Sequence, residues 1–284
     1  MLYAFLATFI STVSLVAHKF TLSNLKVNSR VFNLVVFIFL AGTALIWAYF
    51  NNTFPDKSFF EGFSLLLFVA VVFIAFAWNA LFSYALQKEQ MPEAEIIIAL
   101  SPILTIMLAL MFLPEERNLA ILIPAFIAGA ALVWANIGKH HFYFSRSEQI
   151  LLIAVLGIAT ETILIKHLLS FIAAEALYAL RCFFTLPFFA LLIGLGPRIK
   201  QKLNLTQIST TGAIGILAAF QMIFFYRAYF LIGVAETTLI SILGPILVLS
   251  FCPYFLKQKV SRKQWIALII ILICIIISEL NFKL

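Results

Sequence analysis

The hydrophobic and polar positions of this chain alternate in long blocks rather than residue by residue. Charged residues, prolines and Asn/Ser clusters interrupt apolar runs that are mostly about 20 residues long, the length of a membrane-spanning helix. Transmembrane β-strands are about ten residues long with an alternating pattern, which these continuous runs lack. The blocks therefore predict an all-α integral membrane protein with ten transmembrane helices, at residues 2–17, 31–50, 62–86, 94–113, 118–137, 150–169, 172–193, 208–230, 236–256 and 264–281.

Composition agrees with a chain that resides in lipid. Of the 284 residues, 64% are hydrophobic and 11% are charged, and the mean hydropathy is +1.10, whereas soluble domains carry about 25% charged residues. So few charges cannot cover a water-facing surface, which excludes soluble enzymes and nucleic-acid-binding proteins and makes the lipid bilayer the expected surroundings. The first run has no basic segment before it and no cleavage site, so it is interpreted as a retained helix rather than a signal peptide.

The net charge of +7 is informative through the position of the basic residues. Thirteen of the nineteen Lys and Arg residues lie in connections after odd-numbered segments, and four lie after even-numbered segments or in the tail. Loops rich in Lys and Arg stay on the cytoplasmic side. The distribution therefore predicts a multi-pass protein of the cell membrane with both termini outside.

An internal repeat relates the two halves of the sequence. Residues 85–113 align without gaps on residues 228–256 at an offset of 143, so that Ser101-Pro102 falls on Gly244-Pro245. Such self-similarity indicates a duplicated structural unit. Upstream, a second and weaker likeness joins the first segment to the sixth.

In that second likeness, residues 12–19 resemble residues 160–167, which places Lys19 opposite His167. We interpret residues 1–140 and 148–284 as two five-helix repeats within a single membrane domain. Because five is odd, the second repeat must enter the membrane in the opposite sense to the first. Inverted repeats of this kind are typical of alternating-access transporters.

The paired motifs also carry a family resemblance. Tyr84-Ala85-Leu86 and Leu100-Ser101-Pro102 are echoed by Tyr226-Arg227-Ala228 and Leu243-Gly244-Pro245. Together with ten predicted helices, they resemble the drug/metabolite transporter superfamily, specifically its ten-helix EamA-type members, over the whole chain. The resemblance implies export or exchange of small metabolites such as amino acids, with the first four helices of each half around a central cavity. The chain departs from the family pattern in its outward termini and in Gln258-Lys259, where an acidic residue is expected.

Glu161 is the sharpest candidate for chemistry, because ionisable residues inside a membrane are costly and by default suggest function. It lies near the middle of the sixth segment between Thr160 and Thr162, with no basic residue one turn away on the same helix. Burial favours the neutral form of a carboxyl group, which would let Glu161 exchange a proton near neutral pH and couple proton movement to substrate movement. The alternative is a permanently protonated carboxyl bonded to a threonine or a neighbouring helix.

Polar groups also occupy the centres of the third and eighth segments. Trp78-Asn79 and Gln221-Met222 are related by the offset of 143. Their indole and amide groups offer neutral hydrogen bonds and a stacking face, which suits an uncharged or zwitterionic ligand. We therefore take Trp78, Asn79 and Gln221 as candidate cavity residues, with hydrogen bonding between helices as the alternative.

Several further polar residues lie nearer the ends of the segments or on other helices. Tyr226 and Arg227, and Tyr84 in the first copy of the motif, are candidate binding residues. Arg227 would meet a carboxylate, close a gate or extend to the headgroups. Arg181, deep in the seventh segment, is expected to form a structural ion pair with another helix. His18 is interpreted as an interfacial residue, with a pH sensor as the alternative.

Pro102 and Pro245 are predicted inside helices of both copies. Proline removes a backbone hydrogen bond and kinks a helix, so both residues are candidate hinges beside the cavity, with a packing kink as the alternative. Glu93, Glu95 and Glu236 are predicted at the starts of the fourth and ninth helices, where the helix dipole favours negative charge.

These features favour a secondary active transporter, an exporter or exchanger of a small metabolite that works by alternating access with proton coupling or on the substrate gradient. Amino acids or related compounds rank first as substrates, because Arg181 and Arg227 favour a ligand with a carboxylate. The alternatives are a facilitative, channel-like permease and a transporter of organic cations or other metabolites.

An enzyme is not expected. The only aspartate, Asp56, lies in a loop, and nucleotide-binding, HExxH and GxSxG motifs are missing. Cys182, Cys252 and Cys274 lie singly in apolar segments without the spacing of a metal site, so no metal or cofactor is expected. The chain is expected to act as a monomer or homodimer.

Overall fold

The computed structural model describes residues 1–284 apart from positions 56, 90–93, 95–96, 137–144, 196–202, 245–246, 248–261 and 283–284. Within the described part, the elements are α1 (Leu2–Ser23), α2 (Ser29–Phe50), η1 (Lys57–Phe60), α3 (Gly62–Lys88), α5 (Leu100–Phe112), η2 (Pro114–Glu116), α6 (Leu119–Asn136), α7 (Arg146–Leu168), α8 (Ala174–Leu195), α9 (Leu205–Ile232), α10 (Val234–Ser241) and α12 (Arg262–Phe282). No strand occurs among these residues, so the all-helical class is confirmed. Six of the helices are long and apolar enough to cross a membrane, as in a multi-pass membrane protein.

Polar N-caps start two of the helices earlier than the hydrophobic runs do. The Ser145 hydroxyl accepts a hydrogen bond from the Glu148 backbone N–H at 3.1 Å, and the Glu148 carboxylate accepts one from the Ser145 backbone N–H at 2.5 Å. This capping box starts α7 four residues before the predicted position. Asn204 and Gln207 form the same arrangement at the start of α9. Hydropathy assigned these polar first turns to loops.

The predicted helix over residues 94–113 is interrupted. A turn at Ala99 precedes α5, so Pro102 is the third residue of that helix. Ala99 keeps right-handed helical backbone angles, and the residues on both sides of it are helical. The interruption thus lies in the turn before Pro102, where proline removes a backbone hydrogen bond, and the role of Pro102 as a hinge stays a prediction. In the second half, Gly233 separates α9 from α10 with a φ of +86°.

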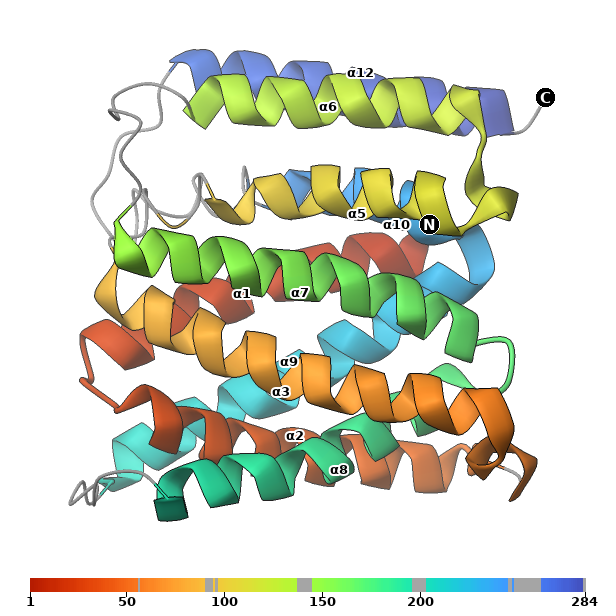
Figure 1. The fold of residues 1–284 in the computed structure, drawn as a ribbon. Coiled ribbons are helices and arrows are strands. Elements are labelled where there is room, and N and C mark those ends of the chain that lie inside the picture. The colour runs from red at the N-terminus through yellow and green to blue at the C-terminus, as the bar shows by residue number, and fades with distance from the viewer. Residues whose placement is uncertain are drawn as a thin grey trace.

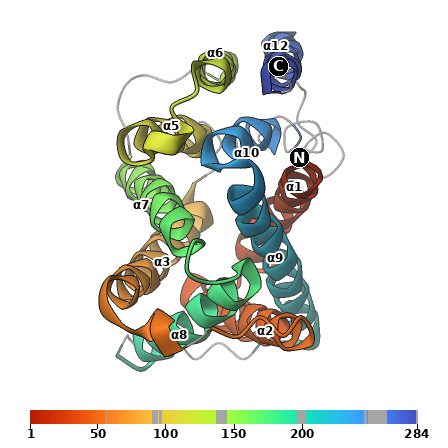
Figure 2. The ribbon, with the colours of Figure 1, turned by 90° about the vertical axis from the view of Figure 1, so that its right-hand side faces the viewer.

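The two halves of the sequence interleave (Figure 1). The most extensive helix contacts join α1 to α9, α2 to α8, α3 to α7 and α6 to α12, and each pair takes one helix from each half. Figure 2 shows α6 and α12 together at one edge of the bundle, α2 and α8 at the opposite edge and the other helices between them. The main hydrophobic core lies toward the α2 and α8 edge.

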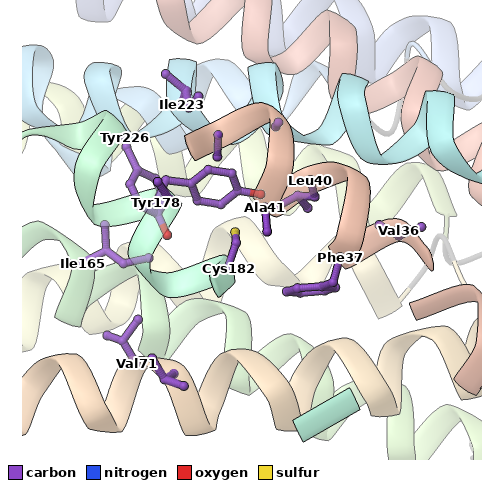
Figure 3. Packing of buried hydrophobic residues seen from close by; sticks show 14 of the residues in the cluster. Val36, Phe37, Leu40, Ala41, Val71, Ile165, Tyr178, Cys182, Ile223 and Tyr226 are labelled. Carbon is purple, nitrogen blue, oxygen red and sulfur yellow. The ribbon is translucent and has the colours of Figure 1, made fainter. Parts of the chain in front are cut away.

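Small residues bring the central helices close together. A Cβ atom on Gly215 of α9 would lie 2.7 Å from the Val36 carbonyl oxygen of α2, and one on Gly157 of α7 would lie 2.9 Å from Cβ of Trp78. Such close approach is typical of helix packing in membranes. Figure 3 shows the adjoining core, in which Tyr178 and Cys182 come from α8. These contacts hold in place the helices that carry the candidate site.

Candidate functional site

A cavity of about 300 Å³ lies in the centre of the bundle, between α1, α2, α3, α5, α7, α8, α9 and α10. Its volume is at the lower end of the range for small-molecule sites, about 300–1,000 Å³. Among the described residues, none from α6 or α12 lines its wall. The cavity is therefore large enough for a small metabolite and is enclosed by four helices from each half.

Matching positions of the two halves form the wall. On α3 and α9 the lining positions are separated by 143 residues: Trp78, Asn79 and Phe82 against Gln221, Met222 and Phe225. On α1 and α7 the separation is 147 residues: Ser11, Ser14, Leu15 and His18 against Ile158, Glu161, Thr162 and Ile165. Four helices thus contribute to the cavity in two equivalent pairs.

The offset of 147 corrects the alignment of the first helix by one residue. The sequence placed Val13 opposite Glu161, but Val13 is exposed on the outside of the bundle. Ser14 is buried and lines the cavity, so it occupies the position equivalent to Glu161. The first half therefore has a hydroxyl where the second has a carboxylate.

Glu161 is held by two residues from other helices. Arg181 of α8 donates from Nε to Glu161 Oε1 and from Nη2 to Oε2, the latter at 3.0 Å, and the Trp78 indole N–H donates to Oε2. The side chains of Arg181 and Glu161 are only 2% and 3% exposed. The ion pair expected for Arg181 is present, and its partner is the glutamate that appeared isolated in the sequence. Such a pair is stable in a low-dielectric interior because each charge compensates the other.

The guanidinium of Arg181 retains donors that Glu161 does not use. A guanidinium has five N–H donors, and Nη1 contacts Cys182 Sγ only at 4.0 Å. The rings of Tyr178 and Trp78 lie beside the cation, with centroids 5.5 and 5.9 Å from Cζ. Nearby, the buried Tyr226 hydroxyl has no hydrogen-bond partner among the described residues. Arg181 also lines the cavity, so this wall offers donors to an acidic ligand group.

The two central amides both face the cavity but bond differently. The Asn79 side chain donates to the Ala75 carbonyl oxygen of its own helix at 2.8 Å. The Gln221 amide lies 4.0 Å from Met222 Sδ, and within the described part of the chain it makes no shorter hydrogen bond. The interhelical side-chain bonds considered for these amides are thus not observed, and Gln221 retains hydrogen-bonding capacity.

A hydrogen-bonded series of polar side chains in the first half was not predicted from the sequence. The Ser83 hydroxyl donates to Asn33 Oδ1 at 2.7 Å and lies 3.3 Å from His18 Nε2, and Asn33 Nδ2 donates to the Asn79 backbone carbonyl at 3.3 Å. The His18 ring stacks on Phe32 and lines the cavity, a contact that the sequence did not predict. The sequence feature that could have indicated this series is Asn33, a polar residue within the second apolar run.

Three other candidates do not line the cavity. Arg227 pairs with Glu175 at the start of α8, and its Nη1 donates to the Tyr3 hydroxyl at 3.2 Å. Tyr226 packs edge-on against Tyr178 in the core. Tyr84 is 39% exposed and accepts a hydrogen bond from Lys88 at 2.5 Å. Arg227 therefore meets a carboxylate, as one of its alternatives proposed, but the carboxylate belongs to the protein.

Of the remaining candidates, some lie in the cavity wall or in α10, and others lie outside the described residues. Pro102 lines the cavity from the first turn of α5. Glu236 is buried in the first turn of α10, where negative charge was predicted. Pro245, Glu93, Glu95 and Cys252 lie outside the described residues. Cys182 and Cys274 are free and buried, and no metal-binding cluster is found among the described residues.

Comparison with known proteins adds a family and a fold. Residues 1–137 and residues 146–279 each match the model of the EamA-like transporter family. A search of curated proteins found no match. A crystal structure described only as that of a protein has a TM-score of 0.79 and 17% sequence identity, covering 99% of this chain and 96% of the other. At that identity the likeness concerns the fold alone.

Proposed function

This chain belongs to the EamA-like transporter family, within the drug/metabolite transporter superfamily, and from that premise we propose that it is a secondary active transporter, an exporter or exchanger of a small metabolite. The observation that carries the proposal is a central cavity with a buried Arg181–Glu161 pair in its wall. Intramembrane charges facing a cavity mark substrate or ion pathways. Trp78, Asn79 and Gln221 complete the proposed binding site.

We assign the mechanism to alternating access between two inverted five-helix repeats, over ten membrane crossings. Support comes from the two matches to one family model, over residues 1–137 and 146–279, and from the paired lining positions of α1 with α7 and α3 with α9. A site between two such repeats lies near the membrane midplane and is exposed to each side in turn. A channel-like permease is the alternative, because a cavity alone does not require alternation.

The proposed substrate carries a carboxylate, and amino acids are the first choice. A zwitterion would present its carboxylate to Arg181 and its ammonium group to Glu161, so that both buried charges stay compensated when the pair separates. The unused donors of Arg181 favour this arrangement. Organic cations are the second choice, since the Trp78 and Tyr178 rings offer cation–π contacts, but Arg181 already lies against those rings.

Proton coupling follows from the same pair when the substrate is a carboxylate without an ammonium group. Such a ligand on Arg181 would leave Glu161 buried without a counter-charge, and an unpaired buried charge is costly. One proton would then enter with each substrate anion. A zwitterion satisfies Glu161 directly and would move without a proton. Under this proposal, the charge of the substrate determines whether a proton is transported with it.

Substrate class is tested by thermal-shift measurements on purified protein with amino acids, amines and nucleosides. Stabilisation by amino acids, lost in Arg181→Met, is the expected result, because ligand binding to the native state raises the unfolding temperature. Stabilisation by an amine without any amino-acid response would overturn the ranking.

Coupling is tested by uptake of a carboxylate without an ammonium group into proteoliposomes under an imposed pH gradient. Glu161→Gln keeps the size and hydrogen-bonding capacity of the side chain but cannot ionise, so we expect loss of pH-gradient drive with ligand binding retained. Glu115→Gln makes the same chemical change at an exposed position and serves as the matched control. Unaltered proton-driven uptake in Glu161→Gln would disprove the coupling.

We further propose that the protein lies in the cell membrane with both termini outside, as a monomer or homodimer surrounded by lipid. The basic residues at one end of the helices support this orientation. Sided labelling of a cysteine introduced before α1 or after α12 distinguishes it from the opposite orientation.

A further inference from the structure

At one end of the bundle, a lysine of α1 bonds the C-terminus of α3. Lys19, in the last turns of α1, donates from Nζ to the Leu86 carbonyl oxygen at 2.6 Å and to the Glu89 carbonyl oxygen. Leu86 is among the last four residues of α3, whose carbonyls have no partner within the helix. An ammonium group at a helix C-terminus satisfies such carbonyls and interacts favourably with the helix dipole.

The other end of the bundle repeats this contact. Lys166, in the last turn of α7, donates from Nζ to the Tyr229 carbonyl oxygen at 2.8 Å. Tyr229 is among the last four residues of α9, and it follows Leu86 by 143 positions, the spacing that relates the two copies in the sequence. The alignment had placed Lys19 opposite His167, whereas the contacts match Lys19 with Lys166. The same bond therefore joins equivalent helices at opposite ends of the bundle.

The two contacts lie next to the two ends of the cavity, and Tyr229 itself lines its wall. His18 and Ile165, the residues before each lysine, both line its wall, as do Phe82 and Phe225, one helical turn before the two acceptor carbonyls. Each lysine thus joins two lining helices at the level where the cavity ends. A movement that opens the cavity at one end has to separate the helices that the lysine joins.

The contact at Lys166 includes a carboxylate. Glu116 Oε1 lies 3.7 Å from Lys166 Nζ, and its two oxygens accept hydrogen bonds from the Val234 and Ala235 backbone N–H groups at 2.7 Å each. Glu116 therefore caps α10 as well as facing the lysine. A Cβ atom at Gly233 would approach Glu116 Oε1 to 3.0 Å, so this glycine leaves room for the carboxylate. Lys166 is thereby connected to the start of α10.

We propose that Lys19 and Lys166 are the two latches of the transporter, each of which must release for the cavity to open at its own end. The inference rests on the proposed alternating access. Lys19 holds its end through two backbone carbonyls with the Glu89 carboxylate nearby, whereas Lys166 bonds one carbonyl and faces Glu116. Release of the Lys166 latch frees the carboxylate that caps α10.

The test is access of a membrane-impermeant maleimide to a cavity cysteine, Ser11→Cys, in inside-out and right-side-out vesicles. The labelling of the same chain without Ser11→Cys is subtracted as background. Removing a hydrogen bond to a charged group shifts an equilibrium by roughly tenfold or more. We expect Lys19→Met to raise labelling about tenfold from one side of the membrane and Lys166→Met from the opposite side. The criterion is independent of which side is cytoplasmic.

Matched controls exist at both ends. Lys88→Met removes a cation whose Nζ bonds Tyr84 on the same helix, and Arg117→Met removes one whose Nε bonds the Leu110 carbonyl of the same segment at 2.8 Å. Neither joins two helices through these bonds, so neither should change the sidedness. Lys19→Arg and Lys166→Arg keep the charge and donors and should restore labelling toward the original pattern.

If Lys166→Met does not fold, Glu116→Gln provides the second variant. It weakens the Lys166 contact while leaving an acceptor for α10, and it should shift labelling to the same side by a smaller factor. No shift beyond the controls, or a shift to the same side in both lysine variants, would overturn the proposal. Labelling needs neither substrate nor proton gradient. If the two lysine variants shift labelling to opposite sides but no transport of the proposed substrate is detected, the proposed substrate is wrong and the latches are supported.

Discussion

The two halves give the cavity matching walls and unequal chemistry. Ser14 of α1 and Glu161 of α7 occupy equivalent positions, as do Trp78 of α3 and Gln221 of α9. Both members of the buried ion pair, Glu161 and Arg181, come from the second half, and the first half supplies the indole that bonds the carboxylate. Duplication thus accounts for the matching helices around the cavity, whereas divergence of one copy accounts for the buried charges.

The halves also differ in how closely their helices pack. Gly215 of α9 lies against α2, whereas Val72, 143 positions earlier on α3, is a buried branched residue. Consistently, α9 packs more extensively on α2 than α3 packs on α8. The cavity is therefore built on one tight crossing and one looser crossing rather than on two identical ones.

The largest expected effect comes from breaking the ion pair of the second half. Arg181→Met leaves Glu161 buried without a counter-charge, and loss of one partner of a buried pair costs about 3–5 kcal/mol in the free energy of unfolding. Denaturant unfolding in detergent measures this loss.

The control for that prediction removes both charges. Arg181→Met combined with Glu161→Met replaces the pair by apolar side chains and should recover most of the lost stability, since well-packed apolar replacements of buried pairs are often neutral or stabilising. A double variant as unstable as the single one would show that the packing of Arg181, and not the charge of Glu161, determines the loss.

The second prediction compares the equivalent positions Trp78 and Gln221. Trp78→Phe keeps a ring but loses the N–H that donates to Glu161, and a hydrogen bond to a charged group contributes about 1.5–3 kcal/mol. Gln221→Met loses only a long contact to Met222 and should change stability by about 0.5 kcal/mol or less. Thermal unfolding of the two variants side by side measures the difference, and equal losses would contradict the assigned asymmetry.

The third prediction concerns the tight crossing. A Cβ atom at Gly215 would meet a backbone oxygen that cannot rotate away, so Gly215→Ala should destabilise by about 1 kcal/mol, the lower end of the range for overpacking. Gly42 lies on α2 with nothing within 4 Å of an added Cβ atom, so Gly42→Ala should be neutral or stabilising through helix propensity. If both variants unfold at the same temperature, the close approach of α9 to α2 has no energetic weight.

The hydrophobic pattern was sufficient to predict the all-helical class and the six long apolar helices, because the length of an apolar run can be counted directly in the sequence. The repeat was equally visible, since matching motifs recur at a constant spacing. Glu161 and Trp78 were identifiable for a similar reason, as polar groups within apolar runs. The helices and these polar groups are properties of one segment considered alone, and the repeat is a comparison of two stretches of sequence.

The partners of those residues were not predictable in the same way. Arg181 bonds Glu161 across 20 positions and two helices, and Lys19 bonds Leu86 across 67. Which side chains meet depends on how the helices cross, and no helix-local rule contains that information. The start of α7 was predicted wrongly for the opposite reason. Its capping box is a local sequence feature, but a criterion based on hydropathy does not detect polar residues at a helix start.

The smallest expected effect again separates the halves, at the N-termini of α1 and α7. The N-cap of α1 is Met1, which makes no side-chain cap hydrogen bond, whereas Ser145 and Glu148 form a reciprocal box on α7. Ser145→Ala removes the oxygen that accepts the Glu148 N–H and should cost about 0.5–1 kcal/mol, seen as faster hydrogen exchange in the first turn of α7. Ser145→Asp retains an acceptor and should preserve the protection. Loss of protection in both variants would mean that the Ser145 contact with Glu89, and not the cap, holds the start of the second half.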